Sequence, residues 1–205
     1  MTHHAPTEES TTRNNSDLTA IQHVLGGNRT AFEALYTKYV KRIYTMVRRM
    51  VSVPLEAEEV TQEAFYQVYR ALPSFQGNSQ FYTWMYRIAT NVALQHVKKQ
   101  IRMRRNVPFD DTHASEALAQ RTEAGDPQKV SETRALFTAI EHRIETLPIN
   151  QRVVMILGPI QGHSYDEMAQ IIGTTTEVVK ARLHRARENL REDLARLRGP
   201  ACDTP

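Results

Sequence analysis

The fold of this chain is decided by residues 164–190, SYDEMAQIIGTTTEVVKARLHRARENL. Ser164 and Glu167 have the spacing of a capping box, in which the hydroxyl and the carboxylate satisfy free amides at a helix start. Gly173 is expected to end this short helix, because glycine readily adopts the left-handed conformation of a sharp exit. A second capping box is expected at residues 174–177, at the start of a longer helix. The pattern predicts two helices joined by one tight turn.

The composition of this helical pair is typical of a helix-turn-helix. Ala169 is small enough for the helices to cross closely, Gly173 makes the corner, and Val179 fills the angle between them. Arginine and lysine on the outer face of the second helix suit guanine edges and phosphates. The residues expected to meet DNA are Thr176, Glu177, Lys180, Ala181, Arg182, His184, Arg185 and Arg187. A helical hairpin with a solvated basic face is the structural alternative, and a helix-turn-helix also suits repressors and response-regulator output domains.

A second motif combines aromatic and basic residues. Residues 75–87, FQGNSQFYTWMYR, hold five aromatic residues, although aromatics make up only 7% of the chain, so this is a marked concentration. Helical spacing places Phe81 and Met85 on the buried stripe, Trp84 at its border, and Tyr82, Tyr86, Arg87 and Thr90 outside it. The same helix leads into the basic residues Lys98, Lys99, Arg102, Arg104 and Arg105. Aromatic faces beside cations favour single-stranded nucleic acid, whereas the alternative is an aromatic core beside a solvated helix end.

Apolar residues recur at helical spacing through most of the remaining chain, and no alternating strand pattern competes with them. The prediction is an all-α protein with two small helical domains at residues 17–106 and 131–198. A leader at 1–16, which has no apolar run, is expected to be disordered, and an acidic stretch at 107–130 is expected to be a flexible linker. Residues 199–205 form a tail. Gly158 and Pro159 are expected to interrupt a helix.

Several classes of function are disfavoured by the residues present. Cys202 is the single cysteine, which favours a reducing cytoplasmic setting. No stretch approaches the roughly 20 apolar residues of a membrane span. The histidines are scattered and none is paired with an acid or a nucleophile at a meaningful spacing, so we expect no enzyme activity, no metal and no cofactor.

The two motif sets together resemble the extracytoplasmic-function (ECF, group IV) sigma factors of bacterial RNA polymerase. The resemblance to region 2 of that family is carried by residues 62–65 (QEAF), 69–72 (YRAL), 74–75 (SF) and 81–91 (FYTWMYRIATN). The resemblance to region 4 is carried by residues 147–148 (LP), Arg152, Gly162, 164–169 (SYDEMA) and 179–188 (VKARLHRARE). It spans residues 17 to 198 apart from the connector.

The resemblance implies a sigma region 2 bundle and a sigma region 4 helix-turn-helix, and it implies three sets of site residues. Those for capture and melting of the minus-10 element are Asn78, Ser79, Phe81, Tyr82, Trp84, Tyr86, Arg87 and Asn91, beside the cations Lys98, Lys99 and Arg102. Those for the minus-35 element are the outer-face residues of the helix-turn-helix. Those for docking on core polymerase are Glu59, Val60, Gln62, Glu63, Phe65, Tyr66 and Tyr69.

The partners implied are the β-prime coiled coil and β flap of core RNA polymerase, promoter DNA in double- and single-stranded form, and an anti-sigma factor, which is often membrane-tethered. The free protein is expected to be a cytoplasmic monomer that acts in a stress or envelope response. The alternative function is a repressor or activator that binds its operator without polymerase. Such a protein has no use for an aromatic strip that leads into a basic helix.

Overall fold

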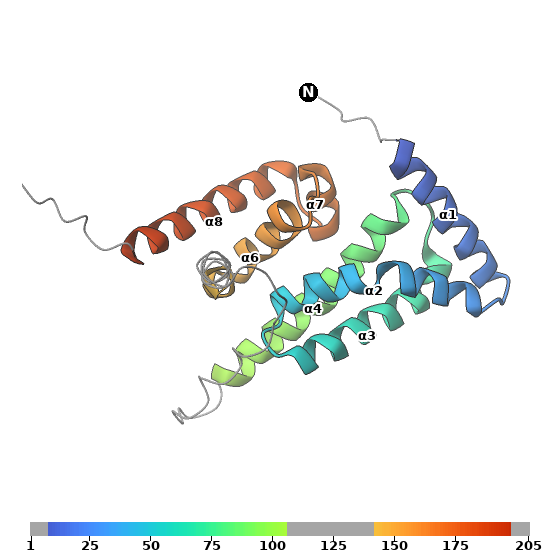
Figure 1. Cartoon of the computed structure of the whole chain (residues 1–205), viewed down its shortest axis with the longest axis horizontal. Coiled ribbons are helices and arrows are strands. Elements are labelled where there is room, and N and C mark those ends of the chain that lie inside the picture. Colours follow the sequence, from blue (N-terminus) through green and yellow to red (C-terminus); the bar gives the residue numbers. More distant parts are fainter. Residues whose placement is uncertain (1–7, 106–141, 198–205) are drawn as a thin grey trace, which may run out of the picture.

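A computed structural model of the chain describes residues 8–105 and 142–197 (Figure 1). The N-terminal half comprises α1 (Glu8–Leu25), α2 (Thr30–Met50), α3 (Pro54–Ala71), a 3-10 turn (Leu72–Ser74) and α4 (Phe81–Arg105). The C-terminal half comprises helical residues 142–146, α6 (Ile149–Met155), a π-helical turn (Ile156–Ile160), α7 (Tyr165–Ile172) and α8 (Thr176–Leu197). The expected linker at 107–130 and the start of the helix expected from residue 131 lie outside the described residues.

The helices of the N-terminal half form where apolar side chains recur every three or four residues. The stripe of α2 is buried at Leu35, Tyr39, Ile43, Met46, Val47 and Met50. Pro54 occupies the first turn of α3, where its missing N–H costs no helical hydrogen bond. Gly77 has φ of +74° in the turn before α4, a conformation that side chains other than glycine rarely adopt. The turn lets α4 run back across α2 and α3.

The first helix begins earlier than the sequence indicates. Helix α1 starts at Glu8, within the stretch expected as a disordered leader. Its contact with α2 includes a buried carboxylate, Asp17, which accepts a hydrogen bond from the Tyr39 hydroxyl and forms an ion pair with Lys38. Once this packed turn is formed, each preceding residue adds one hydrogen bond that roughly offsets the entropy lost in fixing it, so the helix can extend beyond the contact.

Gly158 and Pro159 interrupt a helix as predicted. Helix α6 ends at Met155, and the chain continues through a π-helical turn that contains Pro159. Proline has no N–H to donate and cannot continue a regular α-helix. Gly158 fits here for a packing reason, since its backbone lies against the buried side chain of Met168 in α7.

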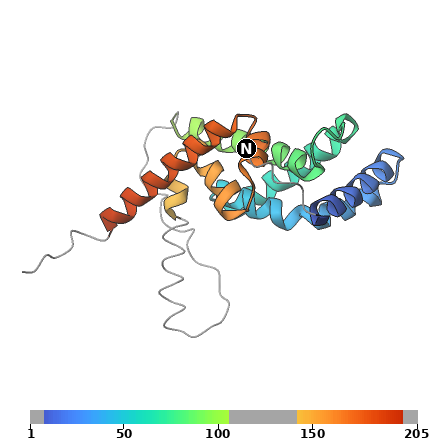
Figure 2. The same ribbon diagram turned by 90° about the horizontal axis from the view of Figure 1, so that it is seen from above.

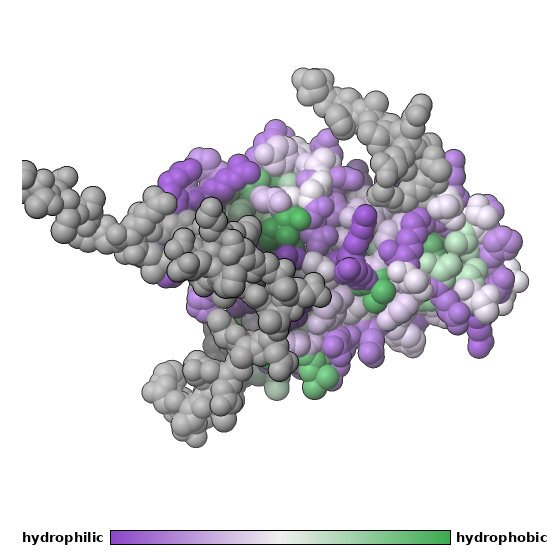
Figure 3. Space-filling view, in the orientation of Figure 1, coloured by the Kyte–Doolittle hydropathy of each residue, from purple (hydrophilic) through white to green (hydrophobic). Residues whose placement is uncertain are grey.

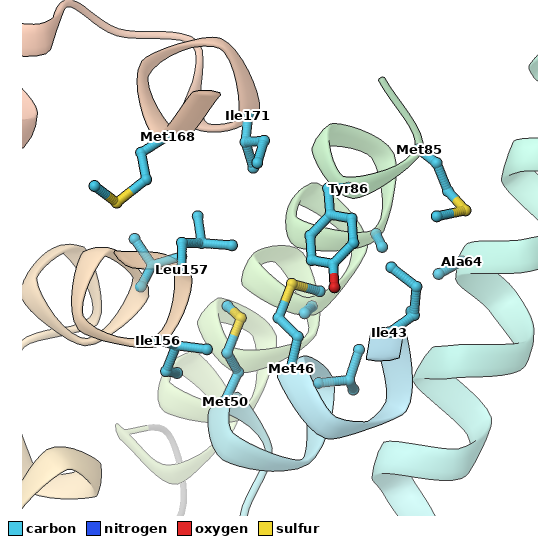
Figure 4. Packing of buried hydrophobic residues seen from close by; sticks show 14 of the residues in the cluster. Ile43, Met46, Met50, Ala64, Met85, Tyr86, Ile156, Leu157, Met168 and Ile171 are labelled. Atoms are coloured by element: carbon cyan, nitrogen blue, oxygen red, sulfur yellow. The ribbon is translucent and has the colours of Figure 1, made fainter. Parts of the chain in front are cut away.

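The two halves pack against each other through α4 and α7, and α1 and α8 lie to either side of this contact in both views (Figures 1 and 2). Figure 4 shows Ile156 and Leu157 of the C-terminal half on the side that faces Met46 and Met50 of α2. The Arg152 guanidinium also crosses between the halves, donating to the carbonyl oxygen of Met50 at 3.4 Å. In the described parts of the chain, the buried hydrophobic cluster is therefore continuous from one half to the other.

Candidate nucleic-acid interface

The helix-turn-helix has the caps that position its two helices. The Ser164 side chain accepts a hydrogen bond from the Glu167 backbone N–H at 3.2 Å, and the Glu167 carboxylate accepts one from the Ser164 N–H at 2.8 Å. Both halves of the predicted capping box are present. Gly173 ends α7 with φ of +72°, as predicted. Both ends of α7 are thus fixed by residues close to one another in sequence.

The second capping box differs from the prediction. Helix α8 begins at Thr176, and the hydroxyl of Thr175 accepts the N–H of Val178 at 3.4 Å, so the cap lies one residue later than the 174–177 pattern implies. Glu177 accepts a hydrogen bond from the Thr176 hydroxyl at 3.0 Å. Hydrogen bonds from its own backbone N–H and from the Thr175 and Thr176 hydroxyls lower the pKa of Glu177, which keeps a negative charge at the start of α8. The negative charge of Glu177 interacts favourably with the positive N-terminal end of α8, which stabilises the helix start in place of a full capping box.

Within the part of the chain that the structure describes, the outer face of α8 is exposed or half-buried. Val179, Leu183 and Ala186 are buried against the rest of the C-terminal half. The predicted minus-35 residues on the other faces are exposed or half-buried, namely Thr176, Glu177, Lys180, Ala181, Arg182, His184, Arg185 and Arg187. Figure 3 shows hydrophilic side chains along the outer edge of α8. This helix therefore presents cations on a firmly packed support.

A cavity of about 480 Å³ brings together four of the residues predicted to capture and melt the minus-10 element. Asn78, Ser79, Trp84 and Arg87 line it from the N-terminal half, together with Phe75 and Thr83. Its volume is within the roughly 300–1,000 Å³ of sites that hold small organic molecules. The opposite wall comes from the C-terminal half, through Ala169, Gln170, Gly173 and Thr174. The surface expected for the single strand therefore lies against the corner of the helix-turn-helix.

Trp84 lies at the border between core and surface, as predicted. Its side chain is half-buried, with its ring 5.0 Å from the Phe75 ring and 5.8 Å from the Phe81 ring. Arg87 and Asn91 are exposed on the following turns, and so are Lys98, Lys99 and Arg102 near the other end of α4. The aromatic residues and cations of the second motif thus lie along a single helix.

The prediction that Tyr86 and Thr90 lie outside the buried stripe is wrong, since both side chains are fully buried. Thr90 donates a hydrogen bond to the Met46 sulfur at 3.4 Å, and Tyr86 is covered by the C-terminal half. Tyr82 is half-buried, with its ring 5.3 Å from the ring of His163. Burial raises the pKa of both tyrosines, so their hydroxyls stay protonated, and that of Tyr86 donates a hydrogen bond to Gln161. A second face of α4 is covered because a second layer of helices packs on it.

The residues predicted to dock on polymerase lie along α3 and differ in their exposure to solvent. Glu59, Gln62, Glu63, Tyr66 and Tyr69 are exposed, whereas Val60 and Phe65 are buried and support this face from behind. Phe65 packs edge-on against Tyr36 at 4.7 Å, and Phe32 packs edge-on against Tyr69 at 5.0 Å. Tyr66 is 54% exposed, and large exposed aromatics of this kind are enriched among residues that dominate protein interfaces.

Two residues that the sequence did not indicate, Gln161 and His163, complete the contact between the halves. The Tyr86 hydroxyl donates to Gln161 Oε1 at 2.8 Å, and the Tyr82 hydroxyl lies 3.4 Å from His163 Nε2. His163 is buried, and this burial lowers its pKa to about 4. No periodic pattern marks these residues, because they lie in a turn and their partners are more than seventy positions away in sequence.

No helix within residues 8–105 or 142–197 is both long and apolar enough to cross a lipid bilayer. Within the same ranges, no group of three histidine, cysteine, aspartate or glutamate side chains is arranged to hold a metal ion.

Comparison with known proteins identifies the family. Residues 35–103 match the model of Sigma-70 region 2, and residues 137–190 match a model of Sigma-70 region 4. The ECF RNA polymerase sigma-E factor of Escherichia coli is 34% identical over 178 residues, covering 84% of this chain and 91% of the relative. The RNA polymerase sigma-H factor of Pseudomonas aeruginosa is 32% identical over 174 residues, covering 84% of this chain and 90% of the relative.

Solved structures share the fold. CnrH in complex with the cytosolic domain of CnrY is similar with a TM-score of 0.63 at 20% identity, covering 88% of this chain and 97% of that chain. The sigma factor RpoE of Bartonella quintana, in complex with the anti-sigma factor NepR, is similar with a TM-score of 0.60 at 22% identity, covering 80% and 96%. The two family models cover most of the chain and the two relatives match it over most of their length, so this chain belongs to the ECF family of RNA polymerase sigma factors.

Proposed function

We propose that this chain binds core RNA polymerase in the cytoplasm, recognises the minus-35 and minus-10 elements of its promoters, and promotes melting of the DNA. The polymerase performs the chemistry, and the chain itself needs no cofactor and catalyses no reaction. The observation that carries the proposal is the combination of two different DNA surfaces in one chain. One is an exposed basic helix on a capped helix-turn-helix, and the other is the N-terminal wall of the cavity, where an aromatic ring, Trp84, lies beside a cation, Arg87.

The minus-35 element is read by α8. Lys180, His184 and Arg185 are exposed on one face of this helix, which suits hydrogen bonding to base edges in the major groove. Arg182 and Arg187 on the flanks contact phosphates, which sets the position of the helix without reading sequence. Glu177, at the helix entrance, repels phosphates and restricts how deeply this end enters the groove.

The minus-10 element is captured as a single strand by the turn at 76–80 and by α4. Extruding a base costs a few kcal/mol of lost stacking, which a shaped pocket must offset. Asn78 and Ser79 supply polar groups, and Trp84 supplies an aromatic face at the melting fork. Arg87, Lys98, Lys99 and Arg102 attract the backbone of the separated strand.

Core polymerase binds the exposed face of α3, with Tyr66 and Tyr69 at its centre and Glu59, Gln62 and Glu63 around them. Residues 17–106 and 131–198 act as the two functional units, and the second unit also contacts the polymerase β flap. CnrH was solved with the cytosolic domain of CnrY, and the Bartonella RpoE with the anti-sigma factor NepR. We extend this to the present chain, with an anti-sigma factor that covers these binding surfaces until a stress or envelope signal arrives.

The proposal is tested by transcription in vitro. The purified chain and bacterial core polymerase are incubated with genomic DNA of the source organism, and transcript 5′ ends are mapped. Transcripts that require both proteins and share two upstream elements are expected. Specific binding of an operator by the chain alone, with no association with core polymerase at any salt concentration, would show a repressor instead.

A further inference from the structure

The C-terminal half covers the surface on which the proposed base capture depends. The cavity lined by Asn78 and Arg87 is closed on its other side by Gln170 and Thr174 of the helix-turn-helix. Tyr86 follows Trp84 by two residues in α4, and its side chain is fully buried beneath the same half. A single strand cannot enter this cavity along its full width while the two halves remain in contact.

The separation of the two promoter elements requires a different arrangement. Their positions are about 25 base pairs apart, which corresponds to on the order of 85 Å of B-form DNA at about 3.4 Å per base pair. Helix α8 has 22 residues and is thus about 33 Å long at about 1.5 Å per residue. It begins next to Thr174, which lines the cavity, so no residue of α8 lies farther from the cavity than about this length. The described arrangement is therefore a closed state that must open on a promoter.

The turn at residues 161–163 makes the polar part of the contact. Gly162 has φ of +79°, which bends the chain so that the side chains before and after it both meet α4. Gln161 accepts the hydrogen bond of Tyr86, and the His163 ring stacks on Tyr82 with an interplanar angle of 24°. The edge of the same imidazole meets Tyr86, with ring centroids 4.7 Å apart.

Apolar side chains make the rest of the contact. Leu157 and Ile171 lie on the side of α2 and α4 in Figure 4, where Met46 and Tyr86 are opposite them, while Met168 points back into the C-terminal half. All five side chains are buried. A contact of this kind is non-directional and does not depend on pH, so any pH dependence of the closed state arises from its polar part.

We propose that residues 161–163 form a latch that holds the C-terminal half over the base-capturing cavity, and that protonation of His163 releases it. The biological effect of opening rests on the proposed function, because opening matters only if the cavity captures DNA. The latch itself is a property of the free chain.

The groups that face His163 explain why the closed state disfavours its cation. The Tyr82 and Tyr86 hydroxyls of α4 present dipoles but no negative charge. Arg42 of α2 repels the protonated form of His163, whereas Glu167 of α7 attracts it. Burial outweighs the attraction to Glu167, and the pKa of His163 falls from 6.5 to about 4. An imidazolium in this position loses its hydration without gaining a directly bonded carboxylate.

The sign of the pH dependence follows from proton binding. The closed state binds fewer protons than an open state whose imidazole is in water. The free-energy preference for the closed state is therefore fully present above pH 6.5 and declines as the pH falls toward 4. Between pH 7.5 and pH 5.5 the ratio of open to closed molecules is expected to rise about tenfold. Mild acidification is therefore expected to raise the fraction of open molecules in the free chain.

The test measures the distance between the halves in the free, full-length chain. Donor and acceptor fluorophores are attached at Q22C on α1 and R191C on α8, both exposed positions, after C202S removes the natural thiol. Transfer efficiency is expected to fall between pH 7.5 and 5.5. H163F keeps an aromatic ring that cannot be protonated, so it is expected to remove this change, while H23Q, at an exposed histidine of α1, is expected to retain it.

Circular dichroism at both pH values shows whether each variant is folded. If H163F unfolds, Y86F replaces it, because loss of the 2.8 Å hydrogen bond to Gln161 is expected to raise the open fraction at pH 7.5 and leave the titration in place. Equal transfer efficiency at both pH values in the folded wild-type chain overturns the latch. So does an unchanged pH response in folded H163F. Neither result depends on polymerase, so failure of the latch and failure of the proposed function in transcription are distinguished.

Discussion

The backbone of Gly158 approaches the side chain of Met168 so closely that an added Cβ would lie 3.0 Å from both its Sδ and its Cε. Met168 is 1% exposed and belongs to the buried hydrophobic cluster. The residue pair that interrupts α6 therefore also sets how closely the π-helical turn and α7 pack.

Replacing Gly158 with alanine is expected to lower the free energy of unfolding by about 1–3 kcal/mol, because the methyl group overpacks this contact. Thermal unfolding followed by circular dichroism measures the effect. Gly26 is the matched control, since a Cβ there meets the Gln22 carbonyl oxygen at an ordinary 3.4 Å. An unchanged unfolding temperature in G158A would show that Met168 moves aside at no cost.

Tyr66→Ala is expected to weaken association with core polymerase at least tenfold, or about 1.4 kcal/mol, without lowering the unfolding temperature. The side chain is 54% exposed, so its removal leaves no cavity in the core. Titration of labelled chain with core enzyme measures the affinity. Tyr165→Ala, a second exposed tyrosine but on α7, is expected to bind as the wild type does. Equal losses in both variants would remove the special role of the α3 face.

Trp84→Ala is expected to impair promoter melting more than polymerase binding. Stacking of a base on an aromatic side chain contributes about 1–3 kcal/mol, so open complexes are expected to fall roughly 5- to 150-fold. Permanganate reactivity of unpaired thymines measures melting, and titration with core enzyme measures binding. Trp84→Phe retains a ring beside Phe75 and is expected to restore part of the melting. Equal loss of both activities would identify Trp84 as core alone.

Arg185→Ala is expected to weaken recognition of the upstream element by about 1–3 kcal/mol and to relax preference at the base that it contacts. Arg187→Ala is the matched comparison, at another exposed arginine of α8. It is expected to weaken binding to all DNA sequences alike and to reduce the slope of log affinity against log salt concentration by about one. Transcription from promoters with single changes in the upstream element, at several salt concentrations, separates the two effects. Unchanged transcription from every dependent promoter would exclude Arg185 from reading.

The parts of the fold that depend on local chemistry were predictable. The capping box at Ser164, the left-handed Gly173 and the break at Gly158 and Pro159 each depend on residues within a few positions of one another. The apolar stripes of α2 and α3 were predictable for the same reason, because helical spacing alone places them on one face.

The contact between the halves was not predictable from periodicity. A helical pattern shows which face of α4 is the most apolar, but tyrosine and threonine suit both surface and core, so Tyr86 and Thr90 gave no sign of burial. Their partners come from elsewhere in the sequence, Met46 for Thr90 and Gln161 for Tyr86. The cap of α8 was misplaced by one residue because three consecutive threonines offer the same hydroxyl.

The ion pair and hydrogen bond of Asp17 have a consequence for the register of α1. Its carboxylate is 2% exposed and is held by Tyr39 and Lys38 of α2. Sliding α1 by one position along α2 would leave this charge buried without partners, a far greater penalty than shifting one apolar side chain past another. A single buried anion thus ties the first helix to one position along α2.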